Sequence, residues 1–149
     1  MNDAARTLLV AGTLAGLAAT SFVWQLRQHD REAHERLIGE LRAANAAALA
    51  LAVTAGSTIG FAMARDSAST SALEVAMAML FVGVAGWMLL RSPREALFIA
   101  AVAFIVHALL DLAHRPGALS TEVYPRNYVI ASALYDAWLA GLCFVARQR

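Results

Sequence analysis

The sequence has little charge, few helix-breaking residues and almost no cysteine. Of its 149 residues, 15% are charged, three are proline and one is cysteine, and every basic residue other than histidine is arginine. The lone Cys143 excludes an intramolecular disulfide framework. With a net charge of +1 and no clustered basic surface, the chain is not expected to bind nucleic acid.

Short motifs of several common enzyme classes are also missing. The sequence contains no glycine-rich phosphate loop, no H-E-x-x-H, no G-x-S-x-G and no cysteine pair. We therefore do not expect ATP-driven transport by this chain alone.

Hydrophobic residues, in contrast, are abundant. They make up 60% of the chain, against about 45–50% in soluble domains, and a small soluble fold could not bury them all. Runs of about 20 apolar residues are long enough to cross a bilayer as helices. The five such runs are residues 7–26, 43–64, 72–90, 96–114 and 128–146. The sequence predicts one all-α domain over residues 1–149, a polytopic integral membrane bundle of five transmembrane helices.

The arginines predict how this bundle is oriented. Five crossings place Arg27, Arg31, Arg36, Arg42, Arg91, Arg94, Arg147 and Arg149 on one side, and Arg6, Arg65, Arg115 and Arg126 on the other. Because cytoplasmic loops carry the excess of arginine, we expect a multi-pass protein of the cell membrane. Its amino terminus lies outside and its carboxyl terminus lies in the cytoplasm. Membrane lipids are then its first partners.

A charged cytoplasmic connection, residues 27–42, joins the first two predicted spans. Glu32 and Arg36 are four residues apart, which favours a helical ion pair. We expect a solvated connecting helix, with an extension of the flanking helices or a docking surface for a partner protein as alternatives.

Two pairs of glycines suggest close helix packing. Gly12 and Gly16, and likewise Gly56 and Gly60, lie four residues apart, a spacing that lets helix backbones approach in lipid. Packing within the bundle is the simpler interpretation, and a homo-oligomer face is the alternative.

One predicted span departs from the apolar pattern. His107, Asp111 and His114 lie at positions i, i+4 and i+7 and so share one stripe of a helix. The next span carries Tyr135 and Asp136, and a short loop makes the two helices antiparallel neighbours. Counted at 1.5 Å per residue, His107 lies about 10 Å and Asp136 about 12 Å from the outer ends of their helices. We therefore expect the two side chains to meet, in a pocket that opens outwards.

Other polar or sulfur-containing side chains are expected in the same outer half of the bundle. They are Thr54, Ser57 and Thr58 in the second span and Glu74, Met77 and Met79 in the third.

A metal site is one interpretation of this stripe. His107, Asp111, His114 and Asp136 are its candidate ligands, and imidazole with carboxylate suits zinc, non-haem iron or copper. The separation of about 10 Å between His107 and His114 would strain a site that used both. Haem is disfavoured, because no two histidines face each other at equal depth from different helices.

Acid–base chemistry and a structural clamp are the alternatives. His107, Asp111, Asp136 and Tyr135 are the candidate catalytic residues for proton transfer to or from a membrane-soluble substrate. The same hydrogen bonds could instead only fix the register of two helices. The sequence thus predicts an outer-facing His/Asp pocket that binds a metal ion or performs acid–base chemistry. The alternative is a non-catalytic accessory or scaffold subunit of a membrane complex or homo-oligomer.

Overall fold

The computed structural model describes residues 3–29, 34–63, 68–114 and 126–148. Within them, side chains are described for residues 10–29, 34–63, 72–114 and 128–148. The helices are α1 (Asp3–Gln28), α2 (His34–Met63), α3 (Ala68–Met88), α4 (Pro93–Ala113) and α5 (Arg126–Arg147). No strand occurs in the described ranges, and the prediction of an all-α fold is confirmed.

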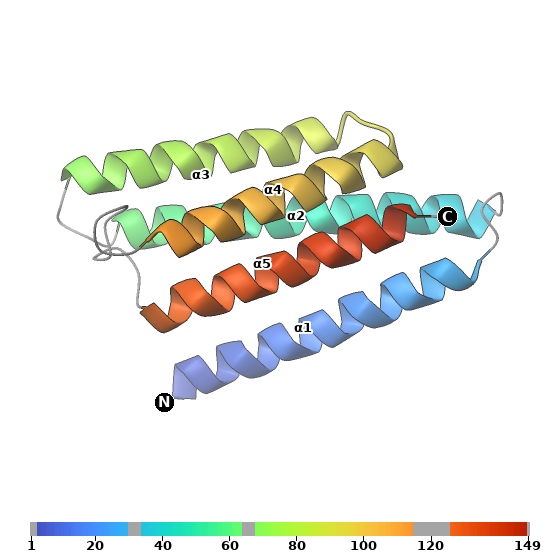
Figure 1. The fold of residues 1–149 in the computed structure, drawn as a ribbon, viewed down its shortest axis with the longest axis horizontal. Coiled ribbons are helices and arrows are strands. Elements are labelled where there is room, and N and C mark those ends of the chain that lie inside the picture. Colours follow the sequence, from blue (N-terminus) through green and yellow to red (C-terminus); the bar gives the residue numbers. More distant parts are fainter. Residues whose placement is uncertain (1–2, 30–33, 64–67, 115–125, 149) are drawn as a thin grey trace.

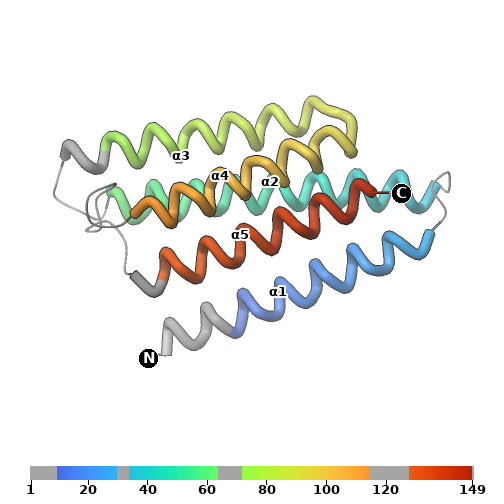
Figure 2. Tube along the Cα trace, viewed as in Figure 1, coloured from blue at the N-terminus to red at the C-terminus, as the bar shows by residue number. Residues whose placement is uncertain are grey.

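The five helices run side by side, each antiparallel to the one before it (Figure 1, Figure 2). The most extensive contact joins α4 and α5, and α2 contacts all four other helices. Helix α1 lies at the edge of the bundle and, among the described helices, contacts α2 and α5. The last turns of α1, α3 and α5 and the first turns of α2 and α4 meet at one end of the bundle, here called the arginine end.

Local sequence signals account for the tight turn between α3 and α4. Pro93 occupies the first turn of α4, where its missing N–H costs no helical hydrogen bond. Ser92 precedes it and donates to Glu95 Oε2 from both its backbone nitrogen (3.3 Å) and its hydroxyl (3.0 Å). The carboxylate thereby satisfies a backbone donor that lies outside the helical ladder.

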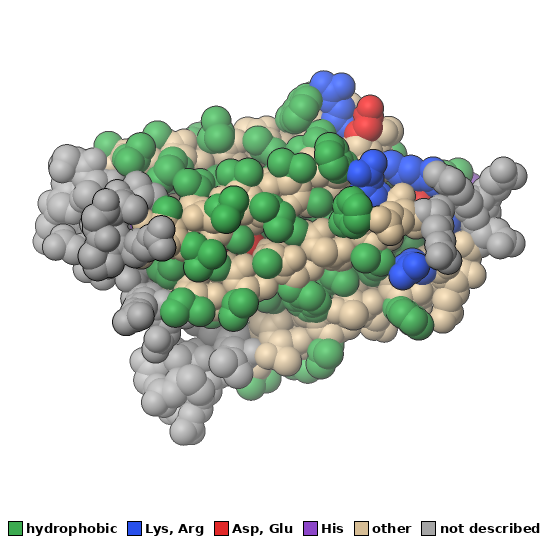
Figure 3. All heavy atoms as spheres, viewed as in Figure 1, with side chains coloured by type: hydrophobic (Ala, Val, Ile, Leu, Met, Phe, Trp, Pro, Cys, Tyr) green, Lys and Arg blue, Asp and Glu red, His purple; other side chains and the backbone are tan. Residues whose placement is uncertain are grey.

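Three of the five helices are long and apolar enough to cross a membrane, namely α2, α4 and the Tyr128–Arg147 part of α5. Helix α3 adds a shorter apolar stretch, Ala72–Met88, within the described side chains. Large hydrophobic side chains point outwards from the bundle, for example Leu49, Leu80 and Leu134, each about two-thirds exposed. Figure 3 shows apolar side chains along the length of the visible face of the bundle and basic side chains near the arginine end. These features are those of a membrane protein.

The connection between α1 and α2 differs from the expected solvated helix. Helix α2 already begins at His34, so its first turns extend the second span toward the arginine end. Arg36 and Glu40 lie in these turns and are each only 1% exposed. Glu32, the expected partner of Arg36, lies outside the described residues.

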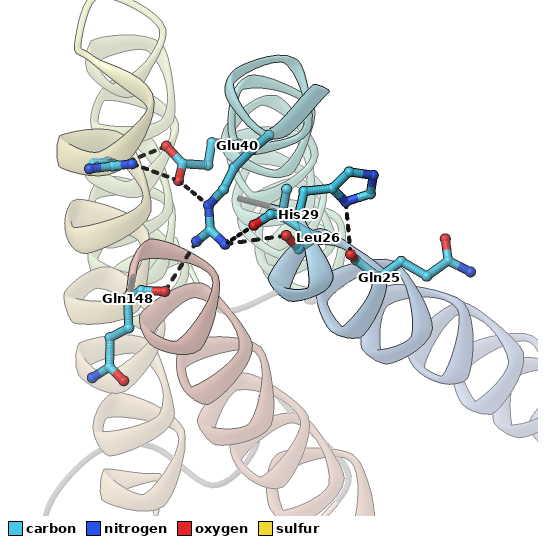
Figure 4. A network of polar contacts seen from close by, with 7 residues as sticks. Gln25, Leu26, His29, Glu40 and Gln148 are labelled. Carbon is cyan, nitrogen blue, oxygen red and sulfur yellow. Dashed lines mark hydrogen bonds and ion pairs between the residues drawn. The ribbon is translucent and has the colours of Figure 1, made fainter. Parts of the chain in front are cut away.

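Arg36 instead joins the ends of three helices (Figure 4). Its Nε donates to Glu40 Oε1 (3.1 Å), its Nη1 to the carbonyls of Leu26 (3.3 Å) and His29 (3.4 Å), and its Nη2 to the carbonyl of Gln148 (3.1 Å). The last carbonyls of a helix have no partner within the helix. A guanidinium with five donors can therefore cap α1 and α5 together.

A fourth helix joins this network through Glu40. Arg94 of α4 donates to both carboxylate oxygens of Glu40, over 2.8 and 3.1 Å. One buried carboxylate thus lies between two guanidinium groups, and α1, α2, α4 and α5 are tied together at the arginine end.

Only one of the four paired glycines packs inside the bundle. A Cβ atom at Gly16 would collide with the ring of Trp138, so the missing side chain lets α1 approach α5. At Gly12, Gly56 and Gly60 an added Cβ would meet nothing within 4 Å. Packing within the bundle therefore explains Gly16 and leaves the other three on open helix faces.

Candidate functional site

The polar side chains of α4 and α5 meet inside the bundle, in the half remote from the arginine end. His107 and Asp111 of α4 are 6% and 7% exposed, and Asp136 of α5 is 1% exposed. One imidazole nitrogen of His107 and one carboxylate oxygen each of Asp111 and Asp136 lie within 4.8 Å of one another. We call these three residues the His107 cluster. The antiparallel packing of α4 on α5 brings His107 and Asp136 to the same depth, as their distances from the helix ends predict.

The imidazole of His107 is oriented by a short hydrogen bond. Its Nδ1 lies 2.7 Å from Asp136 Oδ2 and 3.6 Å from Asp111 Oδ2. An ionised carboxylate can only accept hydrogen bonds, so Nδ1 carries the proton. In the neutral ring the lone pair is then on Nε2. The ring of Phe81 packs edge-on against the imidazole, with centroids 5.0 Å apart and planes at 71°, and helps to fix its orientation.

Asp111 is the unusual member of the cluster. Ser132 hydrogen-bonds its carboxylate, yet Oδ2 is buried and has no hydrogen-bond partner in the described part of the chain. Buried polar atoms are almost always paired, because an unpaired one loses its hydration without compensation. Such an oxygen beside an imidazole and a second carboxylate is a candidate ligand for a cation.

His114 lies apart from the cluster and pairs with α3. Its Nε2 is 2.8 Å from Glu74 Oε1, and its Nδ1 is 2.8 Å from the carbonyl oxygen of Leu110. Both ring nitrogens thus face acceptors, so neither presents a lone pair to a metal ion in this arrangement. The sequence places Glu74 in the correct half of the bundle, but its pairing with His114 depends on how α3 packs on α4.

A small cavity lies between the His114–Glu74 pair and the His107 cluster. Its volume is about 20 Å³, which is room for about one water molecule. Its polar lining consists of Thr58, Glu74, His107, Asp111 and His114. The cavity therefore connects the two histidine–carboxylate pairs.

Tyr135 takes no part in the cluster. Consecutive residues on a helix are about 100° apart, and Tyr135 accordingly points away from its neighbour Asp136. It packs against Trp138, with ring centroids 5.5 Å apart, and lines a separate apolar cavity of about 430 Å³ among α1, α2, α4 and α5. Tyr135, a candidate catalytic residue from the sequence, therefore lies outside the His107 cluster.

The remaining polar neighbours satisfy one another. Ser57 shares a 3.0 Å hydrogen bond with the hydroxyl of Tyr128, and Thr54 and Thr58 donate to carbonyls of their own helix. Met77 lines the small cavity, whereas Met79 is 55% exposed on the outside of the bundle.

No protein-family model matches the chain, and no curated protein or solved structure matches it. The chemistry of the site is therefore inferred from its own side chains.

Proposed function

We propose that the chain is a five-pass membrane protein whose arginine end lies in the cytoplasm and whose amino terminus lies outside. Helices α2, α4 and α5 are long and apolar enough to cross a membrane. Helices α1 and α3 run antiparallel to their neighbours in the same bundle, which supports two further crossings. The distribution of described arginine side chains supports the orientation. Arg27, Arg94 and Arg147 lie in the helix turns at the arginine end, Arg36 and Arg42 in the first nine residues of α2, and Arg91 in the turn between α3 and α4.

Thiol labelling tests this topology. In a Cys143→Ala background, Ser92→Cys marks the turn between α3 and α4, and Ser120→Cys marks the connection between α4 and α5. A membrane-impermeant maleimide added to intact cells should label only Ser120→Cys. Labelling of Ser92→Cys alone would reverse the orientation, and labelling of both would contradict a crossing by α4.

We further propose that the His107 cluster binds a divalent transition metal ion. The observation that carries this proposal is the buried Asp111 Oδ2, which lacks a hydrogen-bond partner beside His107 and Asp136. Two carboxylates in a low-dielectric interior repel each other and lose hydration. A divalent cation offsets both charges, and a mixed imidazole and carboxylate site suits zinc, iron or copper.

A second candidate is acid–base chemistry on a membrane-soluble molecule, and the 2.7 Å contact between His107 Nδ1 and Asp136 Oδ2 favours it. A carboxylate that holds Nδ1–H leaves Nε2 free to accept a proton, as in other histidine bases. The reaction would then require no metal ion.

Elemental analysis of the full chain, purified in mild detergent, distinguishes these candidates. We expect about one metal ion per chain in the wild type and in His29→Ala, which removes an exposed histidine near the arginine end. The double variant His107→Ala/Asp111→Ala should lose the ion. If the wild type stays metal-free after incubation with Zn²⁺, Fe²⁺ and Cu²⁺, the metal proposal is wrong. Co-purification with stoichiometric amounts of other membrane subunits would instead support an accessory role.

A further inference from the structure

The two nitrogens of His107 have different surroundings, and this difference bears on where a metal ion would bind. Both nearby carboxylate oxygens lie on the Nδ1 side, at 2.7 Å for Asp136 and 3.6 Å for Asp111. Nδ1 therefore donates a proton and has no lone pair for a metal ion. Nε2 makes no hydrogen bond within the described residues, although His107 lines the small cavity.

Building on the metal site proposed above, we propose that the ion occupies this cavity. His107 Nε2, Asp111 and Glu74 are its protein ligands, and Asp136 is not a ligand but the carboxylate that positions the imidazole. Metal-binding histidines usually donate their second N–H to a carboxylate or carbonyl, which fixes the ring and raises its basicity. The contact between His107 and Asp136 has this geometry.

The cavity has the size and the lining that such a site requires. Its volume of about 20 Å³ accommodates one water molecule or one ion. Asp111 contributes the oxygen that has no hydrogen-bond partner. Its terminal torsion is soft, so the carboxylate can turn toward an ion at low cost. One nitrogen and two carboxylate ligands leave a coordination position open for water or substrate.

Glu74 brings the third helix into the site. It is 3% exposed and lines the same cavity, and His114 donates to its Oε1 over 2.8 Å. His114 thus positions Glu74 as Asp136 positions His107. The site would join α3 to the tightly packed pair of α4 and α5.

Burial of the carboxylates supports a cation at this position. Asp111, Asp136 and Glu74 are only 7%, 1% and 3% exposed. A divalent ion among them offsets part of the cost of burying carboxylates in the bilayer.

Nuclear magnetic resonance with ¹¹³Cd²⁺ and ¹⁵N-histidine-labelled full chain tests which nitrogen binds the ion. We expect one-bond ¹¹³Cd–¹⁵N coupling to Nε2 of His107, assigned by loss of the signal in His107→Gln. Asp136→Asn should keep this coupling and weaken Cd²⁺ binding by about 10- to 100-fold, as the loss of an outer-shell partner does. Coupling to Nδ1 would overturn the arrangement.

Binding titrations with the same ion test the role of Glu74. Glu74→Ala should weaken Cd²⁺ binding by more than about 100-fold, beyond the range of an outer-shell loss. Glu95→Ala removes a carboxylate in the first turn of α4, outside the cavity, and should leave binding within about threefold. Circular dichroism of each variant establishes that the helices are retained, and Glu74→Gln replaces Glu74→Ala if the latter does not fold. Unchanged affinity on loss of the Glu74 carboxylate would overturn its role as a ligand. Failure of the wild type to bind Cd²⁺ and Zn²⁺ would instead contradict the metal site itself.

Discussion

Arg36 Nε lies 3.1 Å from Glu40 Oε1 in the first turns of α2, and both residues are 99% buried. Arg36→Ala would leave this carboxylate with one partner fewer and remove the guanidinium that caps the terminal carbonyls of α1 and α5. Removal of one member of a buried ion pair costs about 3–5 kcal/mol. We expect a loss of this size in the free energy of unfolding, measured by thermal or denaturant unfolding in detergent. Arg42→Ala, an exposed arginine on the same helix, should change stability little.

Arg94 contacts the same carboxylate but is more exposed. Its side chain is 34% exposed, and solvent screens such pairs, so Arg94→Ala should cost about 0.5–1 kcal/mol, well below Arg36→Ala. A double-mutant cycle with Glu40→Gln measures the coupling directly. If Arg94→Ala is as costly in the Glu40→Gln background as in the wild type, the contact contributes nothing.

Gly16 controls how α1 joins the bundle. In Gly16→Val the new side chain meets the ring of Trp138, so we expect α1 to separate from α5. At Gly12, one turn earlier on the same helix, an added Cβ meets nothing within 4 Å, so Gly12→Val is the matched control. A crosslink engineered between α1 and α5 should form in Gly12→Val and be much weaker in Gly16→Val. Equal crosslinking in both would mean that α1 packs elsewhere.

The sequence predicted correctly those features that depend on the residue pattern of a single helix. Apolar runs of about 20 residues located α2, α4 and α5, and the i, i+4, i+7 spacing placed His107 and Asp111 on one face of α4. The distances of His107 and Asp136 from the outer ends of their helices predicted the contact between them. That prediction needs only the helix rise per residue and a short loop between antiparallel helices.

Features that depend on distant partners were harder to predict. The sequence predicts Arg36 to lie in a solvated connection. The structure buries it instead, because it donates to the backbone carbonyls of Leu26, His29 and Gln148, which no sequence pattern marks. The spacing of Arg36, Glu40, Ala43 and Ala47 continues one stripe of α2, and this was the available signal. The helical spacing of Ser132, Tyr135 and Asp136 predicts one shared face, but Tyr135 lies at the edge of that face and packs against Trp138.

Stability and metal binding should respond in opposite directions at Asp111. Without metal, Asp111→Asn removes a buried charge whose Oδ2 has no hydrogen-bond partner in the described residues, and it relieves repulsion with Asp136. We expect a gain of about 1 kcal/mol, or roughly 2–4 °C in Tm, for the variant in excess chelator. At saturating metal the order should reverse, because only the wild type gains the binding free energy, about 2.7 kcal/mol at one hundred times Kd.

Asp136→Asn is the control for this prediction. It weakens the 2.7 Å hydrogen bond to His107 and should lower Tm with or without metal. A variant Asp111→Asn that is less stable in both conditions would make Asp111 a structural residue, held by its contact with Ser132 and not by a cation.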